Sequence, residues 1–361
     1  MSERINTVNL SHHNNMKTIV LTGGGTAGHV MPNLALVPEL EKHFSKIVYI
    51  GTNGIEKQLA KSANLEFKEI EAVKFVRSLS PKNLLIPARL FRSISQAKKI
   101  LKEINPSVVF SKGGYVSIPV AIAAKKLGIP VLTHESDLSL GLANKIISHY
   151  ATLTLTAFEK TAKGKKRFVF SGSPVRNQIF KGDKSKIKAN LSRNKKTVLF
   201  FGGSLGAKAI NETVFSCLGI LTKKYNVLHI TGKGKKKELK FPNYFAVEYT
   251  NEIENFFNAA DYVVCRAGAN SVFELLALCK PMLLIPLPKA ESRGDQIDNA
   301  KYFKEKGMCE VLFQENLNCE NLIKSLKNLE NNSKIIQKNI KKQEIKSPNK
   351  KIVEIIVENS K

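Results

Sequence analysis

Two glycine-rich turns constrain the fold of this chain more than any other feature. The turn at 23–28 follows the apolar run 18–22, and the turn at 202–207 follows the apolar run 197–201. Each run is short and rich in β-branched or aromatic residues, as suits a buried parallel strand, and each turn opens onto a helical pattern. Glycines let the backbone turn sharply and present N–H groups at a helix N-terminus, which attracts phosphate. The repeat predicts a duplicated nucleotide-type fold, with a phosphorylated donor in one half and an acceptor in the other.

The length of the chain indicates two domains. At 361 residues it exceeds what one hydrophobic core usually serves. Strand-like and helix-like segments alternate in both halves, which predicts an α/β protein with two doubly wound parallel sheets. We expect a first domain over 16–175 and a second over 176–345, joined near 172–190. The polar, lysine-rich stretch 330–350 indicates a tail, and residues 350–361 are expected to form a helix that packs back on the first domain.

Charge and composition limit the classes of function. The formal net charge of +27 allows an anionic membrane, nucleic acid or a phosphorylated substrate as partner, or a merely lysine-rich solvated surface. The basic runs lack interleaved aromatic residues, so we expect no nucleic-acid binding. The five cysteines are scattered, which indicates neither a disulfide framework nor a zinc site.

Residues 1–15 are polar and aperiodic, consistent with a disordered tail or an upstream start, and no apolar run could span a bilayer. We therefore expect a cytoplasmic protein.

Two polar clusters in the first half are candidates for chemistry. The first glycine turn satisfies GxGxxG, but the second expected strand ends at 49–52 without the carboxylate that a dinucleotide site needs, which weighs against a dehydrogenase. His29 follows the turn directly and is either a general base or a structural histidine. The second cluster, 134–137, ends in Asp137, which could equally belong to a polar turn that caps the helix beginning near Gly141.

The second half carries a matching cluster. The small residues 266–271 follow the expected strand 262–265 and meet a helix N-terminus. Glu274 is expected in the first turn of the helix 271–278, where its carboxylate would either complement the helix dipole or accept ribose hydroxyls. The polar loop 292–300 opens the next helix.

Taken together, these segments resemble the MurG family within glycosyltransferase family 28. The resemblance spans Met16 to about Phe313. Its carriers, in order along the chain, are GGGTAGHVMP at 23–32, SKGGYVSIP at 111–119, HESDLSLGLANK at 134–145, SGSPVR at 171–176, GGSLGA at 202–207, CRAGANSVFE at 265–274 and GDQIDNA at 294–300.

The resemblance implies the GT-B architecture, two Rossmann-like domains around a deep cleft. It further implies an inverting hexosyltransferase of peptidoglycan synthesis. Such enzymes move N-acetylglucosamine from UDP-GlcNAc to undecaprenyl-diphospho-N-acetylmuramoyl-pentapeptide (lipid I) and so form lipid II. A diacylglycerol galactosyltransferase and a UDP-sugar epimerase are alternatives within the same architecture, and a basic nucleotide-sensing protein is the alternative from another class.

Carried over by position, the resemblance assigns most of the UDP-sugar site to the second domain. It implies that Arg176 and Ser204 bind the diphosphate, that Thr250 lies against uracil and that Gln296 reads the sugar. The segment expected to hold phosphate and ribose comprises Ala269, Asn270, Ser271, Val272, Phe273 and Glu274. Thr26, Ala27 and Gly28 are expected at the sugar and acceptor side.

His29 is then the expected base for the acceptor hydroxyl. Because no DxD pair occurs, we expect neither a catalytic metal nor a cofactor, and helix N-termini with Arg176 would stabilise the departing UDP. Three positions depart from the commonest family pattern: Asp137 replaces Asn, Leu205 replaces Gln, and Asp295 replaces a second Gln. Asp137 is therefore also an expected substrate contact, and it is the alternative proton acceptor.

The lipid-linked acceptor requires contact with a membrane. The segment 73–91 mixes apolar residues such as Phe75 and Leu79 with Lys74, Arg77 and Arg89, which suits peripheral binding to anionic lipid on the cytoplasmic face of the bacterial cell membrane. The alternative is an ordinary helix whose apolar face, Leu84 to Phe91, packs in the core.

Overall fold

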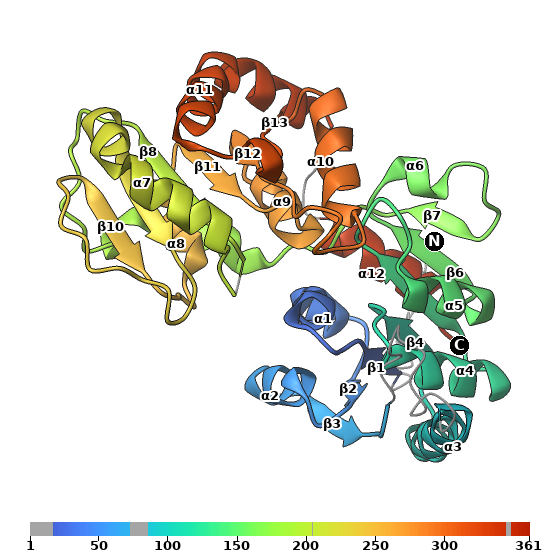
Figure 1. Cartoon of the computed structure of the whole chain (residues 1–361). Coiled ribbons are helices and arrows are strands. Elements are labelled where there is room, and N and C mark those ends of the chain that lie inside the picture. The colour runs from blue at the N-terminus through green and yellow to red at the C-terminus, as the bar shows by residue number, and fades with distance from the viewer. Residues whose placement is uncertain (1–16, 73–85, 204, 344–347) are drawn as a thin grey trace, which may run out of the picture.

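The two apolar runs that precede the glycine turns form the central strands of two parallel sheets. We describe residues 17–72, 86–203, 205–343 and 348–361 of a computed structural model (Figure 1). The strand order is β3-β2-β1-β4-β5-β6-β7 in the first sheet and β10-β9-β8-β11-β12-β13 in the second, so both repeat one Rossmann-like order.

The strands of the first sheet are β1 (Thr18–Thr22), β2 (Lys46–Gly51), β3 (Glu66–Glu69), β4 (Val108–Ser111), β5 (Val131–Glu135), β6 (Leu153–Thr156) and β7 (Phe168–Phe170). Those of the second are β8 (Thr197–Phe201), β9 (Asn226–Ile230), β10 (Tyr244–Val247), β11 (Tyr262–Cys265), β12 (Met282–Leu284) and β13 (Glu310–Val311).

The first sheet is buried on both faces because its side chains alternate between two cores. In β1, Ile19 and Leu21 enter one core and Val20 enters the other. The first core is completed by α1 (Ala27–Leu40), α2 (Ile55–Ser62) and α12 (Asn349–Glu358). The second is completed by α3 (Ile86–Ile104), α4 (Ser117–Lys126) and α5 (Leu142–Tyr150). Such two-sided burial explains the continuous apolar runs in the sequence.

The second domain has a single large core around its sheet. Its helices are α7 (Lys208–Lys224), α8 (Ile253–Ala259), α9 (Ala269–Ala277), α10 (Asp295–Glu305) and α11 (Cys319–Lys342). The expected polar tail from residue 330 is wrong as far as Lys342, since α11 continues to that residue. Leu326, Leu329 and Ile336 are buried on one side of α11, while its lysines lie in solvent.

The domains are joined by packing as well as by the chain. Phe158, which precedes the short helix α6 (Glu159–Ala162), is 1% exposed and packs edge-on against Phe273 and Tyr302 of the second domain, with ring centroids 5.3 and 5.0 Å away. An aromatic side chain of the first domain therefore completes the core of the second.

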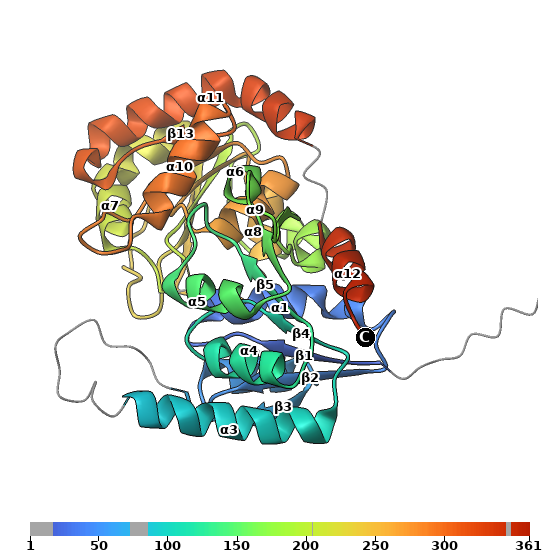
Figure 2. The same ribbon diagram turned by 90° about the vertical axis from the view of Figure 1, so that its right-hand side faces the viewer.

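The last helix returns to the first domain. Ile352, Val353 and Ile356 of α12 are buried beside α1, and Figure 2 shows the two helices next to each other. Asn349 holds the place where the chain crosses back: its side-chain amide donates to the carbonyls of Ala35 (3.0 Å) and Val175 (2.7 Å) and accepts from the Val175 N–H (2.9 Å). Asn349 thus links the two segments in which the chain passes between the domains, one near Val175 and one near Asn349 itself.

Candidate functional site

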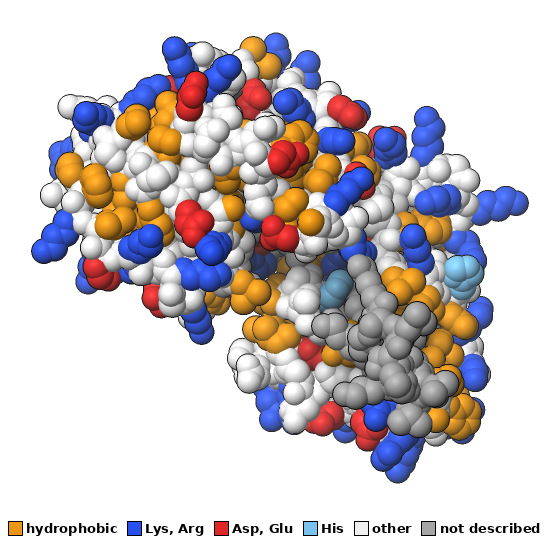
Figure 3. Space-filling view, viewed as in Figure 1, with side chains coloured by type: hydrophobic (Ala, Val, Ile, Leu, Met, Phe, Trp, Pro, Cys, Tyr) orange, Lys and Arg blue, Asp and Glu red, His pale blue; other side chains and the backbone are white. Residues whose placement is uncertain are grey.

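The functional loops of each domain meet at the carboxyl edge of its sheet. In the first domain they follow β1 and β4, and in the second they follow β8 and β11. In each sheet, the strand that follows the first of this pair lies on one side, and the strand that follows the second lies on the other side. The crevice between the two strands of the pair is the usual ligand site of such folds. Figure 3 shows the hollow between the two domains, with lysine and arginine side chains scattered over the face seen.

The first glycine turn is held from within the protein. The Gly25 N–H donates to Glu56 Oε2 at 3.3 Å, and the other oxygen of this fully buried carboxylate accepts from the backbone N–H and the hydroxyl of Thr52. A second turn packs directly on this one, because a Cβ at Gly114 would lie 2.3 Å from the Gly24 carbonyl oxygen and 3.2 Å from His29 Cδ2. Gly114 also has φ +81°, so both its conformation and its surroundings require glycine.

His29 lies in the first turn of α1 and has a defined tautomer. Its Nδ1 lies 3.2 Å from the carbonyl oxygen of Lys112, the residue that follows β4. Because a carbonyl only accepts, Nδ1 carries the proton and Nε2 is the bare nitrogen of the neutral ring. Burial lowers the pKa of His29, and the positive charge of Lys112 lowers it further. The ring is therefore neutral at physiological pH, as a general base requires.

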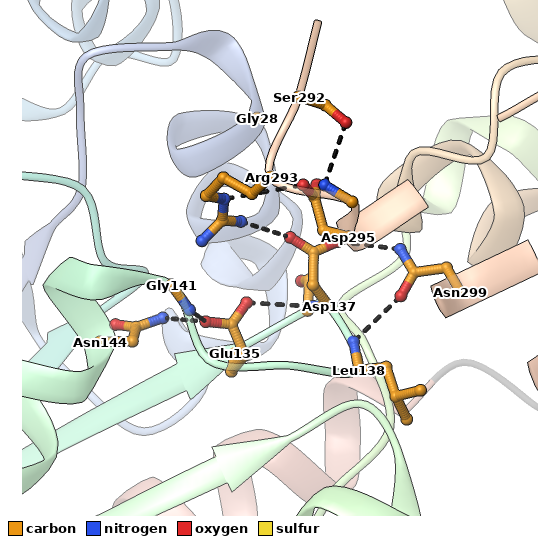
Figure 4. Close-up of polar contacts among 12 residues, drawn as sticks. Gly28, Glu135, Asp137, Leu138, Gly141, Asn144, Ser292, Arg293, Asp295 and Asn299 are labelled. Carbon is orange, nitrogen blue, oxygen red and sulfur yellow. Dashed lines mark hydrogen bonds and ion pairs between the residues drawn. The ribbon is translucent and has the colours of Figure 1, made fainter. Parts of the chain in front are cut away.

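Asp137 is bound to the other domain (Figure 4). One carboxylate oxygen accepts from Asn299 Nδ2 at 3.0 Å, and the other pairs with Arg293 at 3.3 Å. Burial raises the pKa of Asp137 to about 6, and the nearby Glu135 carboxylate raises it too. The alternative that Asp137 caps the helix near Gly141 is wrong, because α5 begins after Gly141 with no side-chain cap among the described residues and Glu135 accepts the Gly141 N–H at 2.9 Å.

The second glycine turn borders a cavity of about 320 Å³. Gly206 has φ +69°, and a Cβ there would lie 2.0 Å from the Thr231 carbonyl oxygen. Among the residues expected from the sequence, Ser271 and Gln296 line the cavity, and the Gln296 side chain accepts from the Leu287 N–H at 3.1 Å. Ser204 lies outside the described residues.

Arg176 and Glu274 form a bidentate pair. Arg176 Nε and Nη2 donate to the two carboxylate oxygens of Glu274 at 2.6 and 2.8 Å. The helix α9 begins at Ala269, so Glu274 lies in its second turn and the expected place in the first turn is wrong. In this pair the charges of the guanidinium and the carboxylate neutralise each other. The pair must therefore separate before Arg176 can bind a phosphate, or Glu274 a ribose, with its full charge.

The N-terminus of α9 touches the first domain. Asn270 Nδ2 donates to the Gly28 carbonyl oxygen at 3.0 Å, and the buried side-chain oxygen of Asn270 has no hydrogen-bond partner among the residues that the structure describes. Ala269, Val272 and Phe273 are buried in the core of the second domain. The other residues expected here are more open: Thr26 is exposed, Ala27 is half-buried, and the Thr250 hydroxyl accepts from the Glu252 N–H.

Three residues of this region were not assigned from the sequence. Arg266 lines the cavity of the second domain and donates to Gln314 Oε1 at 2.5 Å, while Glu56 and Lys112 support the first glycine turn and His29. The positions of Arg266 and Lys112 immediately after strands 262–265 and 108–111 were an available signal, because strand ends gather at the ligand edge. Glu56 gave no such signal.

Two Rossmann-like domains that face each other in this way define the GT-B class of glycosyltransferases. The model of the glycosyltransferase family 28 N-terminal domain matches residues 19–156, and that of the C-terminal domain matches residues 197–356. The chain therefore belongs to glycosyltransferase family 28.

Named relatives give the same family. The chain is 46% identical over 307 residues to the UDP-N-acetylglucosamine--N-acetylmuramyl-(pentapeptide) pyrophosphoryl-undecaprenol N-acetylglucosamine transferase of Clostridium botulinum strain Alaska E43, covering 83% of this chain and 86% of that protein. It is 42% identical to the enzyme of the same name from Clostridium tetani, covering 94% and 97%. A crystal structure of Acinetobacter baumannii MurG matches with a TM-score of 0.74 at 25% identity, covering 94% and 99%.

Proposed function

We propose that this protein transfers N-acetylglucosamine from UDP-N-acetylglucosamine to the muramyl sugar of lipid I, giving lipid II. The observation that carries the proposal is the hydrogen bond from Asn270 to Gly28, because it joins the donor-side helix to the residue that precedes His29. A sugar held at the start of α9 would thus have its anomeric carbon near a neutral imidazole. Relatives that carry this activity in their names support the assignment of substrates.

The donor would bind at the carboxyl edge of the second sheet. Its diphosphate would lie at the second glycine turn, where backbone N–H groups and Arg176 are available, and Glu274 would accept the ribose hydroxyls once Arg176 turns to the phosphate. We place Gln296 at the sugar and Thr250 at uracil. Helix N-termini and the guanidinium then stabilise the charge that develops on departing UDP.

His29 suits the role of base better than Asp137 does. Both carboxylate oxygens of Asp137 accept bonds from the second domain, whereas His29 has Nε2 unprotonated and a lowered pKa. His29 Nε2 would remove the proton from the attacking hydroxyl as its oxygen bonds to the anomeric carbon and the bond to UDP breaks. One such displacement inverts the configuration at that carbon.

The decisive experiment is UDP release from UDP-N-acetylglucosamine and a lipid I analogue in the presence of a chelator. We expect UDP and the disaccharide product in equal amounts, and a loss of about 10²- to 10⁴-fold in kcat for His29→Ala. Release with UDP-galactose and diacylglycerol, or epimerisation without an acceptor, would instead assign one of the alternative activities. Full turnover by His29→Ala would remove the assignment of the base.

We also propose that the first domain contacts an anionic membrane surface peripherally, at the cytoplasmic face. Residues 73–85, which carry most of the expected segment, lie outside the described residues. Phe91 on α3 is 73% exposed beside the exposed Arg89 and Arg92, and Figure 2 shows α3 along the edge of the first domain farthest from the second. In the part of the chain that is described, no helix is long and apolar enough to cross a bilayer.

Vesicle binding tests this contact. Phe91→Ser should weaken partitioning onto vesicles with anionic lipid roughly tenfold, because a large apolar side chain no longer enters the interface. Phe180→Ser removes a comparably open phenylalanine, 50% exposed, from the second domain and should change nothing. Equal loss in both variants would place the membrane surface elsewhere.

A further inference from the structure

A buried lysine lies behind the proposed base and is not used by the mechanism. Lys112 is 2% exposed, and its ammonium group donates to His134 Nδ1 at 2.7 Å and to the Ser136 hydroxyl at 2.5 Å. Few lysines are buried to this extent without a carboxylate in direct contact. The cost of burying this charge indicates a role beyond packing.

The partners of Lys112 are fixed in turn. His134 Nε2 lies 2.7 Å from the Gly172 carbonyl oxygen, so Nε2 carries the proton and Nδ1 is left to accept from Lys112. The Ser136 hydroxyl lies 3.4 Å from the hydroxyl of Ser173. Gly172 and Ser173 begin the linker to the second domain. The ammonium group is thus held in one position by two side chains that the linker itself fixes.

The same residue contacts His29 through its backbone, since the Lys112 carbonyl oxygen accepts from His29 Nδ1. We propose that Lys112 is a positioning residue for His29: its carbonyl oxygen sets the tautomer of the ring, and its ammonium group, held by His134 and Ser136, fixes a positive charge in the residue that the ring contacts. The catalytic meaning of this inference rests on the proposed function, whereas the electrostatic coupling does not.

The charged groups around His29 and Lys112 have opposing effects on the pKa values of these two residues. Burial and the ammonium charge of Lys112 lower the pKa of His29. Glu135 and the hydrogen bond to the Lys112 carbonyl oxygen raise it, and Arg293 lowers it. Burial lowers the pKa of Lys112 itself to about 8, while Glu135 and Asp137 act in the other direction. Lys112 is therefore mostly charged at pH 7 and repels a proton from His29.

The direct test is NMR titration of His29 in histidine-labelled protein, assigned with His29→Gln. Lys112→Gln retains a donor for His134 but loses the charge, and we expect the pKa of His29 to rise by about half a unit or more. Lys112→Arg keeps the charge and should keep the wild-type value. The control is Lys280→Gln, which removes a half-buried lysine that donates to the Ala260 carbonyl oxygen in the second domain. If Lys112→Gln does not fold, Lys112→Met repeats the test.

An unchanged His29 pKa in a folded, uncharged variant overturns the inference. The pH profile of kcat/KM gives a second measurement, in which the acidic limb of Lys112→Gln should move to higher pH and lower the rate about threefold below the pKa of His29. If His29 titrates as expected but the wild-type protein releases no UDP, the proposed function fails and the coupling stands.

Discussion

The two glycine turns are almost copies in sequence, yet they have different surroundings in the structure. In the first, a buried carboxylate from α2, Glu56, accepts the Gly25 N–H. In the second, the turn opens into a cavity lined by Arg266 and Ser271. The comparison teaches that a strand-turn-helix motif supplies backbone N–H donors, whereas the neighbouring elements determine whether the protein or a ligand provides their acceptors. We infer that the first turn positions His29 and that the second binds the phosphates.

The strongest test of this division is Gly206→Ala. A methyl group there would lie 2.0 Å from the Thr231 carbonyl oxygen, at a φ of +69° that alanine disfavours, so the turn must move. We expect calorimetric binding of UDP to fall more than 100-fold, a loss of about 3 kcal/mol. Gly234→Ala is the matched control, because Gly234 has φ +70° and no atom of the described residues lies within 4 Å of its Cβ position. Equal losses of UDP binding in both variants would contradict the assignment.

Glu274→Gln should affect the donor side alone. The change breaks the bidentate pair with Arg176 and removes the charge that we expect ribose to meet, so the KM for UDP-N-acetylglucosamine should rise at least about tenfold. The KM for the lipid I analogue should stay within twofold. Glu252→Gln, which loses an exposed pair with Lys186, serves as control. A rise in both KM values for Glu274→Gln would show that the pair supports the whole cleft.

Glu56→Gln examines the first turn. The glutamine amide keeps one oxygen acceptor but places its NH₂ donor beside the Gly25 N–H or the Thr52 N–H. Because two donors then face each other in a buried site, we expect the free energy of unfolding, measured by urea denaturation, to fall by about 2–3 kcal/mol. UDP binding should remain normal, because the second turn is untouched. Weaker UDP binding in the folded variant would mean that the turns share one ligand.

Asp137→Asn should change stability with a distinct pH dependence. The folded pKa of about 6 exceeds the ordinary 3.8, so the folded protein holds this proton more tightly, and wild-type stability falls as pH rises between about 4 and 6. Asparagine removes this loss. The variant should therefore be more stable than wild type at pH 7.5, by up to about 3 kcal/mol, and equal to it near pH 3.5. A constant difference across this range, measured by denaturation at each pH, would show that the carboxylate does not titrate in this way.

Much of the architecture was predictable because it follows from local patterns. Strands 197–201 and 262–265 have the predicted bounds, since fully buried parallel strands are apolar throughout. Helix α11 was missed although its buried leucines and isoleucines recur at helical spacing, because the lysines between them dominate the composition. That error lay in the interpretation and not in the sequence.

The contacts within the site were harder to predict. Arg176 and Glu274 are 98 residues apart, and Asp137 meets Arg293 only because the domains come together. Sequence resemblance named several of these residues as ligand contacts, but it could not show that they pair with one another. Such pairing depends on tertiary geometry, which no local period encodes.

The return of α12 has a consequence for how the chain acquires its structure. The core beneath α1 needs Ile352, Val353 and Ile356, which a ribosome adds only after the entire second domain. During synthesis, the apolar face of the first domain beside α1 therefore stays uncovered until the second domain has been made. The domain that begins first is therefore the last to be finished.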